Sequence, residues 1–182
     1  MKRLQQAAVL VELADEMREQ GSWCGETHIQ KSTYFLQTLF DPELEFEFIL
    51  YRHGPFSFDL RDELMSLRAD GILQLEPQPY PYGPRLRPTA TGEGLKETYP
   101  KTLRERRASI AFIAQRLGPK DVNQLERIAT ALYATQEEPE APPEARARAI
   151  SDLKPHIPQA RALAAIEELD ELAADARALQ EA

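Results

Sequence analysis

The residues best suited to catalysis or metal binding are few and scattered along the chain. The 182 residues include three histidines, His28, His53 and His156, and one cysteine, Cys24. None of them falls into the His-x-x-x-His or Cys-x-x-Cys spacing that brings metal ligands together. Cys24 has no histidine-containing signature around it, which favours an unreactive, buried thiol. Glycine-rich phosphate loops and the Gly-x-Ser-x-Gly nucleophile motif are also missing. We therefore expect no catalytic centre, no metal and no cofactor.

Aromatic and cationic side chains offer a different chemistry, which is binding to a protein or to an anion. In the segment 57–70, a helical wheel with the leucines toward the core leaves Phe58 and Met65 near the outer pole and Arg61 and Arg68 on one flank. The segment contains four acids against two arginines, and it has no Asn, Gln or Lys. It therefore suits a protein surface better than DNA bases. The alternatives are that Phe58 folds back under the next hairpin and that the arginines contact phosphates.

A proline-rich loop over 76–84 precedes the second candidate set. Tyr80, Tyr82, Arg85 and Arg87 combine rings with guanidinium groups, as minor-groove and single-strand binders do. The alternative is that the prolines only stiffen a hairpin.

Hydrophobic periodicity places these side chains on a mostly helical scaffold. Helices are predicted over 3–20, 27–41, 57–70, 103–117, 121–132, 144–153 and 159–180, strands over 72–75 and 85–87, and a turn over 89–94. The alternating residues 45–51 predict either a strand or an extended lead-in to the next turn. The early order of helix, helix, extended segment, helix, strand, loop and strand is that of a winged helix-turn-helix, whose last hairpin is the wing. The predicted fold class is mainly α, with a winged-helix-like domain over 1–98 and a helical region over 99–182, either separate or packed as one unit.

Charge is distributed unevenly along the chain, whose net charge is −8. Residues 85–120 carry +6, whereas residues 1–84 and 121–182 carry −7 each. This pattern is typical either of a surface for an anionic partner or of solvated helix faces. If an anion binds, we expect it on the side of the predicted wing.

Several motifs resemble those of known proteins. The stretch 28–37 contains Lys-x-x-Tyr-Phe-Leu-Gln, 51–57 reads Tyr-Arg-His-Gly-Pro-Phe-Ser, and 67–73 reads Leu-Arg-Ala-Asp-Gly-Ile-Leu. Together they resemble the YwgA-like family and, more distantly, the Panacea domain of SocA-like antitoxins. The segments 124–133 and 153–156 extend the resemblance to most of the chain. It implies a small, bacterial, winged-helix-like protein without a catalytic centre, and Panacea domains neutralise toxins through protein contacts. Unlike them, this sequence has a long helical C-terminal half.

The resemblance also gives the shared motif a structural role. Its residues here are Lys31, Tyr34, Gln37, Tyr51, His53, Gly54, Pro55 and Ser57. In the resembling families the helix that corresponds to 27–41 packs against the Gly-Pro segment. We therefore expect Lys31, Tyr34 and Gln37 to form a polar cluster with Tyr51. We expect His53 to complete the turn by a hydrogen bond, and the segment after the turn to begin a helix capped by a serine hydroxyl.

These observations favour a non-enzymatic adaptor or regulator that binds a protein, in a bacterial defence or toxin–antitoxin setting. The alternative is a dimeric DNA-binding transcriptional regulator. The apolar stripe of the last helix packs either within the chain or on a second copy, which would give a homodimer. No apolar run approaches the ~18 residues of a membrane helix and no signal peptide opens the chain, so we expect a cytoplasmic protein without membrane contact.

Overall fold

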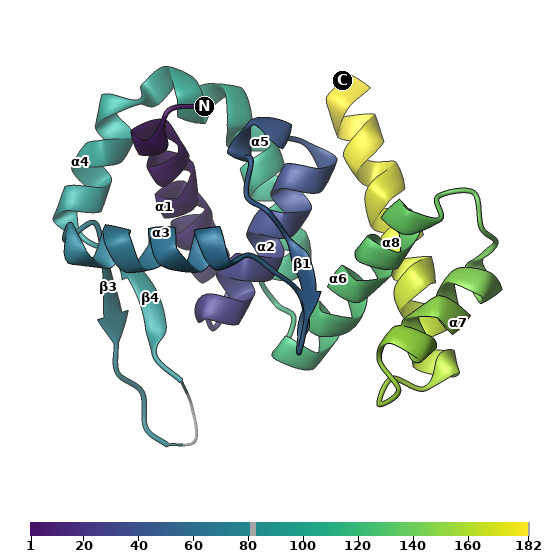
Figure 1. Ribbon diagram of the computed structural model, residues 1–182. Helices are drawn as coiled ribbons and strands as arrows, with labels where there is room; N and C mark the ends of the chain where they lie inside the picture. The colour runs from purple at the N-terminus through teal and green to yellow at the C-terminus, as the bar shows by residue number, and fades with distance from the viewer. Residues whose placement is uncertain (81–82, 182) are drawn as a thin grey trace.

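The protein is mainly helical, with two small antiparallel hairpins, in a computed structural model that describes residues 1–80 and 83–181 (Figure 1). The helices are α1 (Arg3–Glu19), α2 (Glu26–Leu39), α3 (Phe58–Ala69), α4 (Ala90–Thr98), α5 (Pro100–Leu117), α6 (Val122–Glu137), α7 (Pro143–Leu153) and α8 (Gln159–Glu181), and a 3-10 turn, η1 (Pro42–Leu44), follows α2. One hairpin joins β1 (Ile49–Tyr51) to β2 (Gly54–Phe56), and the other joins β3 (Leu73–Glu76) to β4 (Arg85–Pro88). The mainly α prediction is thereby confirmed.

Helices α1 and α2 form the centre of the molecule because both are buried around most of their circumference. In α1 the buried residues include Leu10, Val11 and Leu13, which point in different directions on a helix. Such a helix must be covered on several sides, and α1 packs against α2, α4, α5 and β4. In α2 every residue from His28 to Leu36 is buried. This helix packs against α1, α5, α6 and β2, so it links the two predicted halves.

The C-terminal helices continue the same core. The predicted boundary at residue 98 falls between α4 and α5, and α5 packs along α1. One cluster of buried apolar residues extends from α1 to α8. The apolar stripe of α8, which includes Ile166, Leu169 and Leu172, is buried against α5, α6 and α7. Of the two alternatives for this helix, packing within the chain is therefore the one observed. Figure 1 shows α4 and α7 on opposite sides of the molecule, with α2 between them.

The segment 89–94 differs from its prediction as a turn, because it begins helix α4. Thr89 caps this helix through its hydroxyl oxygen, which accepts a hydrogen bond from the Gly92 amide at 3.3 Å. A Cβ at position 92 would lie 2.6 Å from the carbonyl oxygen of Ile72. Glycine is therefore required here for a close approach to the β3–β4 hairpin rather than for a turn.

The predicted strand over 45–51 is shorter than expected, since only Ile49–Tyr51 pairs with β2. Upstream, the side chain of Gln37 accepts a hydrogen bond from the Phe46 amide at 2.8 Å and donates one to the Phe46 carbonyl at 2.9 Å. A side chain thus takes the place of a neighbouring strand. The sequence also predicts Thr27 as the cap of the second helix, but α2 begins at Glu26 with Gly25 at its N-cap, so Thr27 lies inside its first turn.

Candidate interaction surface

The Gly-Pro-Phe-Ser segment is held in place by buried polar side chains of α2. The ammonium group of Lys31 donates to the Pro55 carbonyl at 2.6 Å. The amide group of Gln30 accepts from the Ser57 backbone at 2.9 Å and donates back to it at 2.8 Å. The hydroxyl of Ser57 accepts from the Leu60 amide at 3.1 Å, which confirms the predicted N-cap. These contacts fix the point and the direction at which α3 begins.

The turn between β1 and β2 is held from the other side by the C-terminal half. Gly54 has φ +81°, and a Cβ there would lie 3.0 Å from the hydroxyl oxygen of Thr130 on α6, so the turn requires glycine. Lys154, after α7, donates to the carbonyls of Tyr51 and Arg52, the latter at 2.7 Å. Sequence reasoning missed Lys154 because its partners are backbone atoms 102 and 103 residues away. The hairpin is thus clamped by both halves of the chain.

A buried carboxylate lies beneath the same turn. Glu126 of α6 is only 5% exposed, and its oxygens lie 3.5 Å from Nδ1 of His53 and 3.1 Å from Nε2 of His156. His53 therefore faces α6 instead of completing its own turn as predicted.

The titratable groups around the hairpin affect one another. Burial lowers the pKa of Lys31 to about 8, an effect opposed by the negative charge of Glu126 and reinforced by the positive charge of Lys154. Among the described residues, no group of three or more His, Cys, Asp or Glu is arranged to hold a metal ion.

The predicted polar cluster of Lys31, Tyr34 and Gln37 with Tyr51 is not what the structure contains. Gln37 binds the Phe46 backbone, and the Tyr34 hydroxyl donates to a glutamine of α6 at 2.5 Å. The reason is geometric, because residues i and i+6 of a helix point about 120° apart. The three side chains therefore hold three different segments. The ring of Tyr51 lies at the surface, with 44% of the residue exposed.

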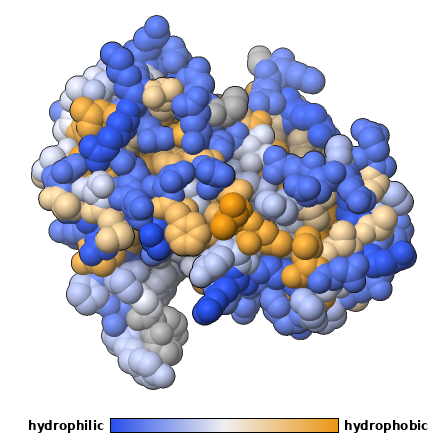
Figure 2. Space-filling view, viewed as in Figure 1, coloured by the Kyte–Doolittle hydropathy of each residue, from blue (hydrophilic) through white to orange (hydrophobic). Residues whose placement is uncertain are grey.

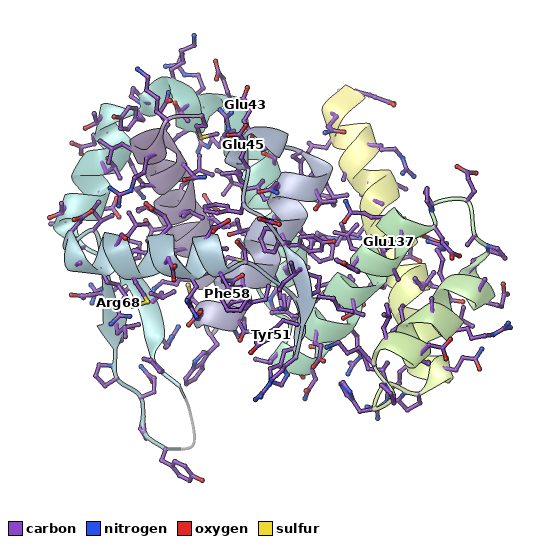
Figure 3. All side chains as sticks on the ribbon, viewed as in Figure 1. Glu43, Glu45, Tyr51, Phe58, Arg68 and Glu137 are labelled. Atoms are coloured by element: carbon purple, nitrogen blue, oxygen red, sulfur yellow. The ribbon has the colours of Figure 1, made fainter. Side chains whose placement is uncertain are left out.

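Tyr51 instead belongs to a cluster of three aromatic rings on the surface. The ring centroids of Tyr51, Phe56 and Phe58 lie 5.2–5.8 Å apart in tilted and edge-on pairs, geometries that aromatic rings prefer. The guanidinium of Arg61 lies 5.0 Å above the Phe58 ring. Figure 3 shows Phe58 and Tyr51 near each other where α3 meets β1. The alternative in which Phe58 folds under the β3–β4 hairpin is therefore wrong, since its ring partners come from β1 and β2.

We call the exposed side chains in this region the α3 face. It consists of Tyr51, Phe58, Arg61, Met65 and Arg68. Met65 is 56% exposed and Phe58 is 39% exposed. Figure 2 shows apolar residues gathered across the middle of the side of the molecule that carries α3. The four residues predicted on the outer side of this helix thus share one surface, and Tyr51 extends it.

A hollow of about 420 Å³ lies between α3 and the β3–β4 hairpin, and we call it the α3–hairpin groove. Its wall includes Trp23, Leu64, Leu75 and Leu86, together with Arg61, Met65 and Arg68 of the α3 face. The guanidinium of Arg68 has no hydrogen-bond or ion-pair partner among the described residues. The first turn of α2 also lines the groove, and its N-cap residue, Gly25, offers no side-chain cap. The positive end of that helix dipole is therefore directed here.

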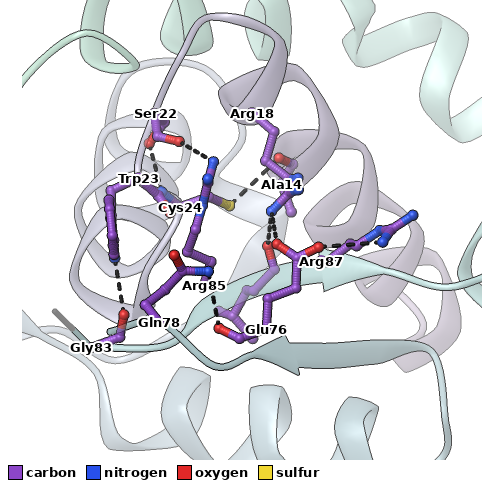
Figure 4. A network of polar contacts seen from close by, with 11 residues as sticks. Ala14, Arg18, Ser22, Trp23, Cys24, Glu76, Gln78, Gly83, Arg85 and Arg87 are labelled. Carbon is purple, nitrogen blue, oxygen red and sulfur yellow. Dashed lines mark hydrogen bonds and ion pairs between the residues drawn. The ribbon is translucent and has the colours of Figure 1, made fainter. Parts of the chain in front are cut away.

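The arginines predicted on the wing have internal partners (Figure 4). Arg85 donates to the carbonyls of Trp23, at 3.1 Å, and of the residue before it, and its guanidinium lies 5.4 Å above the Trp23 ring. Arg87 forms an ion pair at 3.3 Å with Glu76 on the neighbouring strand, and Glu76 also pairs with Arg18 of α1 at 3.2 Å. Arg85 thus fastens the hairpin to the α1–α2 connector, whereas Arg87 joins the two strands of the hairpin through Glu76, which in turn pairs with α1. The two arginines are therefore not arranged as a free anion-binding pair.

Of the two tyrosines predicted on the wing, Tyr80 lies among the described residues. Tyr80 is 97% exposed near the tip of the hairpin loop, whereas Tyr82 lies outside the described residues. The returning part of the loop is tied down, because the Trp23 indole donates to the Gly83 carbonyl at 3.2 Å. Tyr80 is therefore separated from the arginines that were predicted to act with it.

The basic segment 85–120 is neutralised largely within the fold. Its ion pairs with the two acidic segments are Arg87–Glu76, Lys96–Glu12, Lys96–Asp15, Arg106–Asp41, Arg106–Glu43, Arg116–Asp175 and Lys120–Glu168. The alternation of charge along the sequence therefore reflects segments that pack against each other. It provides no support for a broad anion-binding surface on the wing side.

Cys24 lies in the short connector between α1 and α2. Its carbonyl accepts from the Leu86 amide at 2.8 Å, and its amide donates to the Ser22 hydroxyl at 3.0 Å. The residue is fully buried, as predicted. Burial raises the pKa of the thiol to about 12, so the nucleophilic thiolate does not form near neutral pH.

Comparison of the chain with models of known families and with curated proteins gives no match. None of the described helices is both long and apolar enough to cross a membrane.

Proposed function

We propose that this chain is a non-enzymatic binding protein that acts through protein–protein contacts made by the α3 face. The observation that carries the proposal is the composition of that face. Tyr, Phe, Met and Arg are the residue types enriched at protein interfaces, and Tyr and Arg are frequent hot spots of binding energy. Here they occur together, with Tyr51 and Met65 each more than 40% exposed. The resemblance to YwgA-like and Panacea proteins favours the same class of function.

The buried clamp beneath the α3 face supports this proposal. Lys31, Lys154 and Glu126 are each buried to more than 90%, and burying charged groups is costly. Each of them contacts the β1–β2 hairpin, which carries Tyr51. A surface held this firmly loses little conformational entropy on binding, and preorganisation of this kind increases affinity.

We further propose that the N-terminal half is winged-helix-like, with α3 in the position of the recognition helix and β3–β4 in that of the wing. The order of α1, α2, α3 and the hairpin supports this interpretation. In this arrangement the recognition helix would contact a protein, because α3 is more acidic than basic and the wing arginines are already bonded.

A dimeric DNA-binding regulator is the second candidate. The observation in its favour is that Arg61 and Arg68 both line the groove next to the hairpin, where they could reach phosphates. A duplex bound through several phosphates would show an affinity that falls steeply with salt, with a slope of about −0.9 per phosphate contacted.

Site-directed photo-crosslinking in the native host separates the two candidates. A photoreactive amino acid at position 65 should give a discrete cross-linked protein, and Phe58→Ala should abolish it. The matched control is position 177, where Arg177 is exposed on α8, a helix that packs against α5, α6 and α7. Cross-links that are the same at both positions would refute the proposal. Duplex binding that is lost in Arg61→Ala and Arg68→Ala would favour the regulator instead.

A further inference from the structure

The α3–hairpin groove combines an apolar wall with a cationic lip. Trp23, Leu64 and Leu86 belong to the wall, and Met65 stands exposed at its edge. A second hollow of about 440 Å³ shares Met65, Arg68 and Leu75 with the groove. The two hollows therefore adjoin along α3 and β3, which gives room for several consecutive residues of an extended segment.

Two arginines line the lip of the groove, and one of them has no partner within the part of the chain that the structure describes. Arg61 and Arg68 are two helical turns apart on α3 and line the same groove. Arg61 is bonded to its neighbour Asp62, whereas the guanidinium of Arg68 has no partner among the described side chains. Glu26 is the one acidic residue that lines the groove within the described part of the chain. Asp62 neutralises Arg61, so the unpaired cation at this lip, among the described residues, is the guanidinium of Arg68, and the positive end of the α2 dipole lies beside it.

We infer that the groove binds a short segment of a partner protein in which aliphatic or aromatic residues are flanked by Asp or Glu. The apolar side chains of that segment lie against the wall formed by Trp23 and the leucines. A carboxylate of the segment pairs with the guanidinium of Arg68. This inference rests on the proposed function, because it names the chemistry of the partner at the same surface. A phosphate backbone satisfies the arginines but has no apolar groups for the wall, so DNA fits the groove less well.

A random dodecapeptide display library, selected on the immobilised full-length chain, tests this inference. Enriched peptides should combine apolar residues with Asp or Glu. Trp23 is the only tryptophan of the chain and belongs to the groove wall, so each synthetic peptide should shift its fluorescence saturably. Arg68→Glu should weaken the measured affinity by about tenfold or more, because a favourable charge contact becomes a repulsive one. Met65→Ser should weaken it by a similar factor.

Matched controls use residues of the same type away from the groove. Arg177→Glu reverses an exposed charge on α8, and Leu4→Ser removes an exposed apolar side chain on α1; neither should alter the affinity. Three results would overturn the inference: no enriched peptide, enriched peptides without acidic residues, or binding unaffected by Arg68→Glu. If position 65 still gives a specific cross-linked protein in that case, the proposed function survives. If duplex DNA rather than peptide shifts Trp23 in an Arg68-dependent manner, both proposals fail.

Discussion

Replacing Lys31 with methionine should remove a rise in stability that the protein shows between pH 7 and pH 9. Burial lowers the pKa of Lys31 from 10.5 to about 8 in the folded chain. Between these two values the unfolded chain keeps a proton that the folded chain has lost. Because the unfolded state then binds more protons, the free energy of unfolding increases as the pH rises through this window.

The size of this effect follows from the two pKa values of Lys31. The gain in free energy of unfolding between pH 7 and pH 9 is about 1 kcal/mol, and the full difference above pH 10.5 is about 3 kcal/mol. Cys24 acts in the opposite direction, because burial raises the pKa of its thiol from 9.0 to about 12. The unfolded thiol ionises first, which lowers the free energy of unfolding by less than about 1 kcal/mol at pH 9. Measurements up to pH 9 in a Cys24→Ala background therefore isolate the lysine.

Urea unfolding followed by tryptophan fluorescence measures this difference at pH 7, 8 and 9. Lys31→Met also removes the hydrogen bond to Pro55, so its stability should fall at every pH. Its pH dependence should also lose the rise of about 1 kcal/mol between pH 7 and pH 9. Lys101→Met is the matched control, because its side chain is 87% exposed, and it should keep the rise. A Lys31→Met protein with the same pH dependence as its Cys24→Ala parent would show that burial does not shift this lysine.

Further tests address the connector, the hairpin contact and the C-terminal helices. Cys24 should react with a disulfide reagent only through unfolding, because its buried thiol has a pKa near 12; labelling as fast as in urea would contradict this. Gly92→Ala should destabilise by about 1–3 kcal/mol, since the added Cβ would lie 2.6 Å from a carbonyl oxygen, whereas Gly94→Ala meets nothing and should stabilise by about 0.5–1 kcal/mol. Similar melting temperatures for the two variants would refute the packing argument. Asp170→Asn should cost about 1–3 kcal/mol in a urea titration, because it weakens the two-pronged pairing with Arg146, which is 7% exposed; a loss below about 0.5 kcal/mol would place this pair among weak surface pairs.

Local signals in the sequence predicted most of the helical elements. Ser57 followed by an apolar stripe predicted the start of α3, because a capping hydroxyl and a core-facing row of leucines act within a few residues. The same kind of reasoning failed for α4. In the sequence Gly92 indicates a turn. Its role in close packing depends on the Ile72 carbonyl, which lies beside it only in the folded protein.

The α3 face was also predictable in part. A helical wheel identifies Phe58, Arg61, Met65 and Arg68 as outward-facing because these positions depend only on helix geometry. The partners of the arginines on β4 were not predictable, since Arg85 bonds to carbonyls of the α1–α2 connector more than 60 residues earlier. For the same reason a sum of charges by segment could not distinguish an anion-binding surface from ion pairs formed within the fold.

The clamp on the β1–β2 hairpin has a consequence for the order in which the protein matures. Lys154 holds the carbonyl of Arg52 across a separation of 102 residues, and contacts that close such long loops form late in folding. Synthesis proceeds from the N-terminus, so a nascent chain contains Tyr51 and Phe58 long before it contains Lys154. A partner that requires these rings in their fixed arrangement would ignore ribosome-bound intermediates and truncated products. Only chains synthesised through α7 and Lys154 would therefore present the finished surface.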